Sequence, residues 1–520
     1  NWGAQRLLYE ILQLGGLSGM VIVRSLCAGV AFALVVSAAF RRAARIAASD
    51  EDDTVARPRE TTCARVTAIA AFLAFGMIAM NLDARPQMFA LPLFGAGVWL
   101  LFEWPHFFED TNAQRVRGWV SLAGVGALIL TVLWANLHGS FFLAPLLFGC
   151  TFAGETLYHA VAPKKMHFGE PLPLFARRTL GALTIMCTVA IALNPRRFGL
   201  FAYVAKMSTN NTIQKFILEW QPPSFGEGGS IVFFASTLLA GALLVLMARR
   251  VNESVSPVWG VFGVRAGEVL FATILLLMAL RNMRSILWFA LLFVPLFTGI
   301  VTQYLRGRET SGDAASDDAA KSTAEFREPA TPRRAQIINT AILAVLCFLA
   351  VPVLPQFKAN LNWPSSFRAR FAPTPPGEFP SGFGRDPQLI LDRSTPVEAV
   401  AFLQSSPPRR KLWNDMGFGS YLVWALHPQT KVGTDPRIEM YSEKYWLDYL
   451  RLSAGPADAA TQLKNRGVSD ALLDREAQAG LITRLRAAPD WIEIPLPGGP
   501  AVLFRRRPPR LIVEVMRANI

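Results

Sequence analysis

Long apolar runs separated by short polar segments fill most of the first 353 residues of the chain. A helix needs about 20 predominantly apolar residues to cross a bilayer, and tilt accommodates slightly shorter or longer runs. The pattern therefore predicts an α-helical polytopic membrane protein with about ten transmembrane helices. They are expected at 18–40, 64–80, 88–102, 119–135, 140–158, 179–193, 230–248, 266–280, 285–304 and 337–353.

Two segments of this transmembrane domain, which we place at 1–353, follow other patterns. Residues 7–14 (LLYEILQL) are amphipathic, which favours a helix lying along the membrane interface. Residues 305–336 are polar and rich in Ala, Ser, Asp and Glu, which is typical of a disordered loop.

The pattern changes after residue 353. A linker at 354–395 carries seven prolines between Pro355 and Pro387. Short strand-like and helix-like runs then alternate through 396–520, which predicts a soluble C-terminal α/β domain without a GxGxxG nucleotide fingerprint. Its helices are expected near 396–404, 418–425, 443–452, 456–465 and 475–486, and its strands near 410–414, 430–434, 468–473, 491–495 and 501–505.

Charge supplies an orientation. Only 17% of the 520 residues are charged, yet the formal net charge is +14. Alternate loops hold 20 and 7 basic residues, so the positive-inside rule places the richer set in the cytoplasm, as solvated charge. Both chain ends and the C-terminal domain then lie outside the cytoplasm. This distribution explains the basic balance without a nucleic-acid partner, and five cysteines without CxxC spacing predict neither a disulfide framework nor a metal site.

The short outer turns carry unusual polar residues at the membrane boundary. Ionisable groups at that depth are costly unless they are paired or hydrated, so each is a functional candidate. Bland alternatives remain open, since arginines at helix ends often snorkel, Asn-Pro can simply break a helix, and a lone histidine is often structural. Arg24, inside the first run, could face the bundle or contact lipid phosphate. The candidates are Asp83, Arg85, Gln87, Asn136, His138, Asn194, Arg196, Glu219, Arg281, Asn282 and Arg284.

Carboxylates at such a boundary can act as general bases on an acceptor hydroxyl, and arginines beside them can hold a phosphate. We therefore assign Asp83, Glu219 and His138 as catalytic candidates and the others as substrate-binding candidates. A phosphate at this depth indicates a lipid-linked donor, which would be a polyprenyl-phosphate sugar. The arrangement requires no certain cofactor and leaves room for a divalent cation.

Several motifs resemble the GT-C superfamily of integral-membrane glycosyltransferases, in the bacterial protein-mannosyltransferase-like and aminoarabinose-transferase-like group. They are NLDARPQMFALPL (81–93), LWANLHGSFFLAPL (133–146), ALNPRRFGLF (192–201), ILEWQPPS (217–224), ALRNMRSILWFAL (279–291), GFGSYLVWAL (417–426) and VGTDPRIEMY (432–441). The resemblance implies inverting sugar transfer to a lipid, glycan or protein acceptor on the outer face of a bacterial cytoplasmic (inner) membrane.

The resemblance also implies acidic residues in a first outer loop, just after a first transmembrane helix. This chain begins NWGAQRLLYE, which looks like the end of that loop, so we expect the sequence to be N-terminally incomplete. Asp83 takes the place of the missing acidic residue in our assignment. In the C-terminal domain, Asp435 and Arg437 follow a predicted strand and are further substrate-binding candidates. The alternatives to an enzyme are a non-catalytic membrane scaffold subunit and a lipid or solute transporter.

Overall fold

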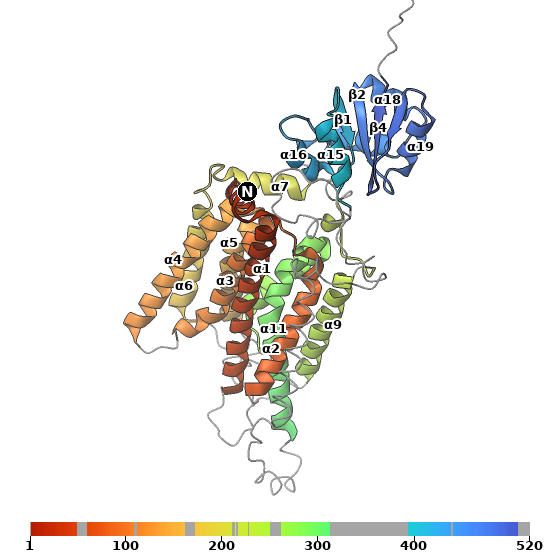
Figure 1. The fold of residues 1–520 in the computed structure, drawn as a ribbon. Coiled ribbons are helices and arrows are strands. Elements are labelled where there is room, and N and C mark those ends of the chain that lie inside the picture. Colours follow the sequence, from red (N-terminus) through yellow and green to blue (C-terminus); the bar gives the residue numbers. More distant parts are fainter. Residues whose placement is uncertain are drawn as a thin grey trace, which may run out of the picture. The chain divides into compact units, whose positions relative to one another are not determined.

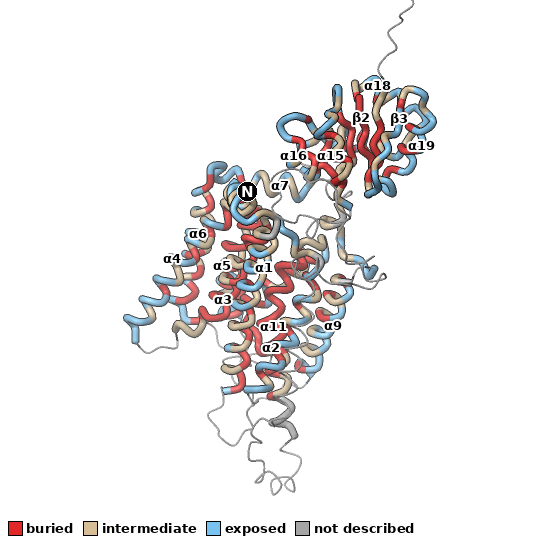
Figure 2. The backbone as a smooth tube through the Cα atoms, in the orientation of Figure 1, coloured by how far each residue is buried: buried red, intermediate tan, exposed pale blue. Residues whose placement is uncertain are grey.

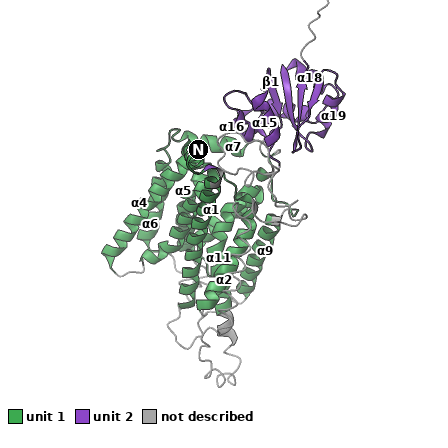
Figure 3. Ribbon diagram, in the orientation of Figure 1, with its two compact units in different colours: residues 1–15, 19–328 green, residues 16–18, 329–520 purple. Residues whose placement is uncertain are grey.

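The computed structural model describes residues 2–48, 60–108, 112–161, 172–210, 214, 217–226, 228–249, 262–312, 394–437 and 440–507. The chain divides into two compact units (Figure 3). The first comprises 1–15 and 19–328, and the second comprises 16–18 and 329–520.

The first unit is a bundle of α-helices linked by short 3-10 helices (Figure 1). Its α-helices are α1 (Trp2–Ala48), α2 (Glu60–Ile78), α3 (Ala90–Glu103), α4 (Ala113–Leu137), α5 (Leu143–Val161), α6 (Leu174–Ala190), α7 (Gly199–Ser208), α9 (Gly228–Arg249), α10 (Ala266–Arg281) and α11 (Ile286–Gly312). The 3-10 helices are η1 (Ala79–Asn81), η2 (Pro86–Phe89), η3 (Trp104–Phe108), η4 (Gly139–Phe142), η5 (Leu218–Trp220) and η6 (Met283–Ser285).

Seven helical segments in the described residues are long and apolar enough to cross a membrane. The predicted spans 179–193 and 266–280 form α6 and α10, which at 17 and 16 residues are shorter than any of these seven segments. The last predicted span, 337–353, lies outside the described residues, so the count of ten stays a prediction. The seven segments are Gly19–Ala48, Glu60–Ile78, Pro86–Phe108, Ala113–Leu137, Gly139–Val161, Gly229–Arg249 and Met283–Arg306.

Exposed apolar stripes identify the faces that meet lipid. On α4, Leu122, Val125, Ile129 and Leu133 are all at least 48% exposed and recur at helical spacing. A soluble helix would bury such a stripe, whereas hydrocarbon solvates it. α11, in contrast, is buried nearly throughout its apolar length and packs against α2, α9 and α10 (Figure 2).

The beginning of α1 agrees in part with the predicted interfacial helix. The helix is interrupted at Gly16, whose φ of 59° is available to glycine at little cost. The segment before this kink packs through Ala4 onto Met88 and Phe89. α11 continues to Gly312, so the first part of the loop expected at 305–336 is helical, and the rest lies outside the described residues.

Two helices of the bundle touch at backbone distance. A Cβ added to Gly154 of α5 would lie 2.6 Å from Gly267 Cα, and one added to Gly267 of α10 would lie 2.7 Å from Thr151 Cα. Small residues permit this approach in membrane bundles, where dispersion contacts replace a hydrophobic driving force.

We expect Gly154→Leu to lower the free energy of unfolding by about 1–3 kcal/mol, because the two backbones must separate. Gly126→Leu on α4 is a matched control, since nothing lies within 4 Å of its added Cβ. Reversible unfolding in mixed detergent micelles measures both, and equal stability of the two variants would contradict the close contact.

The basic loops are not uniformly solvated, which corrects the prediction from sequence. Arg42 of α1 is 1% exposed, and its Nη2 donates to Glu268 Oε2 at 2.7 Å and to Gly263 O at 2.5 Å. Arg265 pairs with buried Glu155 at 3.1 Å. Arg45 of α1 also pairs with Glu103 of α3 at 2.6 Å, so four helices meet through buried and partly buried ion pairs at the end of the bundle where α1 finishes.

The second unit is a four-stranded sheet with helices, built around its own apolar core. The strands are β1 (Lys411–Asn414), β2 (Val468–Asp474), β3 (Trp491–Ile494) and β4 (Ala501–Arg506), in the order β1-β2-β4-β3. β1 and β2 are parallel, and the other neighbours are antiparallel. The helices are α15 (Val397–Ser405), α16 (Gly419–Leu426), α17 (Glu443–Ser453), α18 (Ala459–Asn465) and α19 (Ala479–Ala487).

The predicted strand at 430–434 is wrong. Gly433 N and Thr434 N both donate to Asn414 Oδ1, at 2.9 and 3.1 Å, and Asn414 Nδ2 donates to Thr434 O at 2.7 Å. The asparagine side chain of β1 therefore replaces a backbone ladder along this segment. The apolar and β-branched residues of the segment produce the pattern of a strand without its pairing.

Candidate functional site

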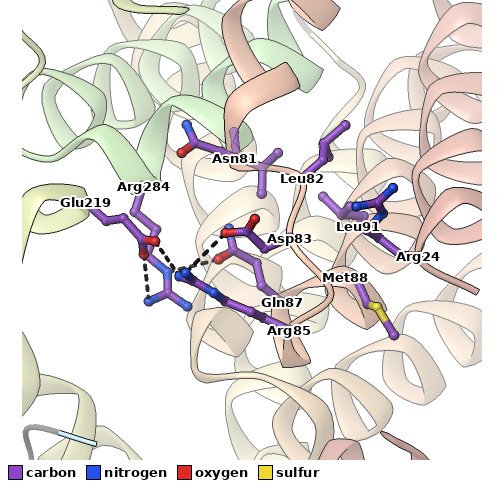
Figure 4. A pocket seen from close by; sticks show the side chains of 11 residues that line it. Arg24, Asn81, Leu82, Asp83, Arg85, Gln87, Met88, Leu91, Glu219 and Arg284 are labelled. Atoms are coloured by element: carbon purple, nitrogen blue, oxygen red, sulfur yellow. Dashed lines mark hydrogen bonds and ion pairs between the residues drawn. The ribbon is translucent and has the colours of Figure 1, made fainter. Parts of the chain in front are cut away.

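A polar pocket lies where several helices of the first unit end (Figure 4). α1 contributes Arg24 from within an apolar span, and α3 and α11 contribute Leu91 and Leu287. The remaining lining residues come from three short segments, 81–88, η5 and η6. They are Asn81, Leu82, Asp83, Arg85, Gln87, Met88, Glu219 and Arg284.

Local turn chemistry presents these side chains. Pro86 occupies the first position of η2 directly after extended Arg85, where its fixed φ suits a helix start. Asn282 accepts hydrogen bonds from Ser285 N at 3.0 Å and Ser285 Oγ at 2.8 Å, which turns the chain from α10 into α11. Met283 N donates to Gln221 O at 3.0 Å, so the segment after η5 is tied to η6.

Ion pairs join the charged residues of the pocket. Arg85 is hydrogen-bonded to Glu219 and pairs with Asp83 at 3.2 Å. Arg284 donates from Nε to Gln87 Oε1 at 2.9 Å, and its Nη1 lies 3.8 Å from Glu219 Oε2. Glu219 therefore bridges two arginines, whereas Asp83 pairs with one and is half exposed. Figure 4 shows Arg85 between Asp83 and Glu219.

The pocket carries a net positive charge, because three arginines face two carboxylates. Arg24 makes no hydrogen bond or ion pair with another residue in the part of the chain that the structure describes, so it is the uncompensated cation. The space among the side chains is about 20 Å³, which holds a single water. A ligand larger than a water molecule therefore requires lining side chains to move.

His138 lies outside the residues that line this pocket. Its Nδ1 accepts a hydrogen bond from Ser140 N at 3.1 Å and lies 2.7 Å from Ser140 Oγ, which in turn accepts from Trp134 Nε1. Burial lowers the pKa of His138, and the charge of nearby Arg284 lowers it further. His138 is thus a neutral cap of η4, with Nδ1 as the acceptor.

Asn136 and Asn194 link two turns away from the pocket. Asn194 Nδ2 donates to Asn136 Oδ1 at 3.0 Å and to Ala135 O at 3.0 Å. Trp2 Nε1 donates to Asn136 Oδ1 at 2.9 Å, so the segment before the kink joins the same network. These amides, which we predicted to bind substrate, are engaged with protein groups.

Two of the predicted phosphate ligands also lie elsewhere. The guanidinium of Arg196 lies 5.3 Å from the ring centre of Tyr203, and Arg281 is exposed on the last turn of α10. Neither lines the pocket, although Arg281 is only three residues from Arg284. Sequence reasoning could not distinguish Arg281 from Arg284, because both lie where α10 ends and η6 follows.

In the second unit, Asp435 and Arg437 bind each other. Asp435 Oδ1 accepts from Arg437 Nε at 2.9 Å and Oδ2 accepts from Nη2 at 2.7 Å, while Asp435 N donates to Tyr441 Oη at 3.0 Å. Burial acts to raise the pKa of Asp435, but the hydrogen bonds from Arg437 outweigh it and the pKa falls below its usual value. The pair closes its own turn, which favours a structural role.

Among the residues that the structure describes, no group of three or more His, Cys, Asp or Glu side chains could hold a metal ion. No protein-family model matches the chain, and no curated protein matches it.

Proposed function

We propose that this protein is a membrane glycosyltransferase that resembles the GT-C superfamily. It would move a sugar from a polyprenyl-phosphate donor to a lipid, glycan or protein acceptor at the outer face of a bacterial cytoplasmic membrane. One observation carries the proposal: an arginine-rich pocket with two carboxylates borders α1, whose neighbouring residues Ile22 and Leu26 face outward at 57% and 61% exposure.

This setting suits a substrate with a charged head and an apolar tail. Arg24, Arg85 and Arg284 would hold the phosphate, since guanidinium groups bind phosphate oxygens through paired hydrogen bonds. The prenyl tail would remain in the hydrocarbon beside α1 while the phosphate head lies in the pocket, so the donor need not leave the membrane to bind.

Asp83 suits the role of general base better than Glu219. Glu219 is held between two arginines, whereas Asp83 has one partner and is half exposed. Asp83 would accept the proton of the acceptor hydroxyl while that oxygen attacks the anomeric carbon. The bond from this carbon to the phosphate oxygen breaks, and polyprenyl phosphate leaves with the electron pair.

The direct test is transfer from a labelled polyprenyl-phosphate sugar in liposomes, with Asp83→Asn as the variant. We expect product with the native chain and little with the variant. Absence of transfer with every donor tried would favour a non-catalytic scaffold. That second candidate is favoured by the paired carboxylates and by a cavity of about 20 Å³.

The proposed orientation gives a further prediction. Alkaline phosphatase fused after Ile520 should be active and a fluorescent protein at the same site dark, because the basic loops alternate with turns that hold few basic residues. A phosphatase fused after Val161, in a basic loop, is the matched control and should be inactive. The opposite pattern would reverse the orientation and place the pocket on the cytoplasmic side.

A further inference from the structure

The second unit has a groove between α15 and α16 that is separate from the pocket of the bundle. The groove has a volume of about 440 Å³, within the range of about 300–1,000 Å³ typical of small-ligand sites. Gln404 of α15, Trp424 of α16 and the following His427, Gln429 and Thr430 line it.

An aromatic ring forms one wall of the groove. Trp424 is 37% exposed, and its ring stacks on Tyr421 with centres 6.0 Å apart and planes at 29°. Tyr421 thus packs beside the indole. A large exposed ring offers a flat, electron-rich face to a ligand.

The rest of the lining combines polar side chains with the apolar residues Leu403, Pro407, Ala425 and Leu426. None of the lining residues is an aspartate, glutamate, lysine or arginine. Gln404 Nε2 donates to Ala425 O at 2.9 Å, which fixes this amide across the two helices. Amide, imidazole and hydroxyl groups can each donate or accept hydrogen bonds.

We propose that this groove binds one or two rings of a neutral saccharide. A pyranose ring has an apolar C–H face, which would stack on Trp424, and an edge of hydroxyls, which would meet Gln404, His427 and Gln429. A phosphate, a carboxylate or a charged peptide would find no counter-charge in the lining. The inference does not depend on the proposed sugar transfer, because binding of a free oligosaccharide in this groove requires no phosphate-linked donor.

The test is saturation-transfer NMR on the full chain in lipid nanodiscs, because a maltoside detergent would itself present a sugar. The probes are maltotriose, mannotriose and triacetylchitotriose. We expect saturation of ring C–H protons in at least one of them, and about a tenfold rise in Kd for Trp424→Ala. Leu447→Ala, which removes another exposed side chain of the same unit, should leave Kd unchanged.

Gln429→Trp provides a second variant in case Trp424→Ala fails to fold. Gln429 is exposed, so the larger side chain fills the groove from its rim without disturbing the core. It should abolish saturation transfer while thermal unfolding stays native. Absence of transfer to all three sugars from the native chain overturns the proposal, as does binding that survives Gln429→Trp unchanged.

Discussion

Glu268→Ala should lower the free energy of unfolding by about 3–5 kcal/mol, because it leaves the guanidinium of Arg42 buried without its counter-charge. Both side chains are at most 3% exposed, and their nitrogen and oxygen are 2.7 Å apart. Glu268 also accepts from Arg265 N at 3.0 Å, so the variant removes the cap of α10 as well. Unfolding of the detergent-solubilised chain, followed by far-ultraviolet circular dichroism, measures the loss.

Glu10→Ala is the matched control. Glu10 pairs with Arg6 in the same unit, but the side chains are 41% and 69% exposed. Exposed pairs contribute about 0–1 kcal/mol, so the control should lie close to the native chain. If both variants unfold alike, the buried pair does not hold the helices together.

A double replacement separates charge from packing. Arg42→Met with Glu268→Leu removes both charges and keeps apolar volume, so it should be more stable than Glu268→Ala alone. Gly299 is small at the point where Arg42 crosses α11, since a Cβ there would lie 2.4 Å from Arg42 Nε. Methionine fits this passage without the cost of an unpaired charge.

Arg284→Ala should reduce transfer from a polyprenyl-phosphate sugar by about one to two decades. A charge-assisted hydrogen bond contributes about 1.5–3 kcal/mol, and the proposed phosphate contact loses one such bond. Arg284→Lys should also be impaired, because lysine keeps the charge but loses the planar fork. Initial rates at several donor concentrations in liposomes give kcat and KM for each variant.

Arg281→Ala is the sharp control for this experiment. It removes the same charge three residues earlier, from an exposed side chain that does not line the pocket. We expect less than a twofold change. Equal losses in the two variants would mean that general surface charge, and not the pocket, attracts the donor.

The apolar pattern was sufficient for the helical class, because hydrocarbon imposes a run length that few other environments demand. It placed α10 to within one residue, but α6 begins five residues before its predicted span and ends three residues before the predicted end. The strand at 430–434 failed for a different reason. A side chain of β1 satisfies its backbone, and no local pattern reports such a partner.

The sequence predicts which segments of the chain form the candidate site, but it does not predict which of their residues line the pocket. Asp83, Arg85, Gln87, Glu219 and Arg284 meet, but Asn136 and Asn194 bind each other in a separate network. The choice of hydrogen-bond partners decides which of these residues line the pocket, and the spacing of residues in the sequence does not reveal that choice. Arg24 had a readable signal, since an arginine inside an apolar run must face something polar. The buried Arg42 was missed because its neighbours Arg41 and Arg45 made it look like loop charge.

α1 is packed closely against the bundle in two regions of its length. One region precedes the kink at Gly16, where Ala4 is buried, and the other begins at Ala31, which packs against Gly95. No residue between 19 and 30 is fully buried, and over this length of about 18 Å the partly buried Val23, Cys27 and Ala28 make the packing contacts. Arg24 lies near the middle of this stretch, where a helix held at both ends bends most easily. A movement that widens the pocket would therefore cost least in this weakly packed part of α1.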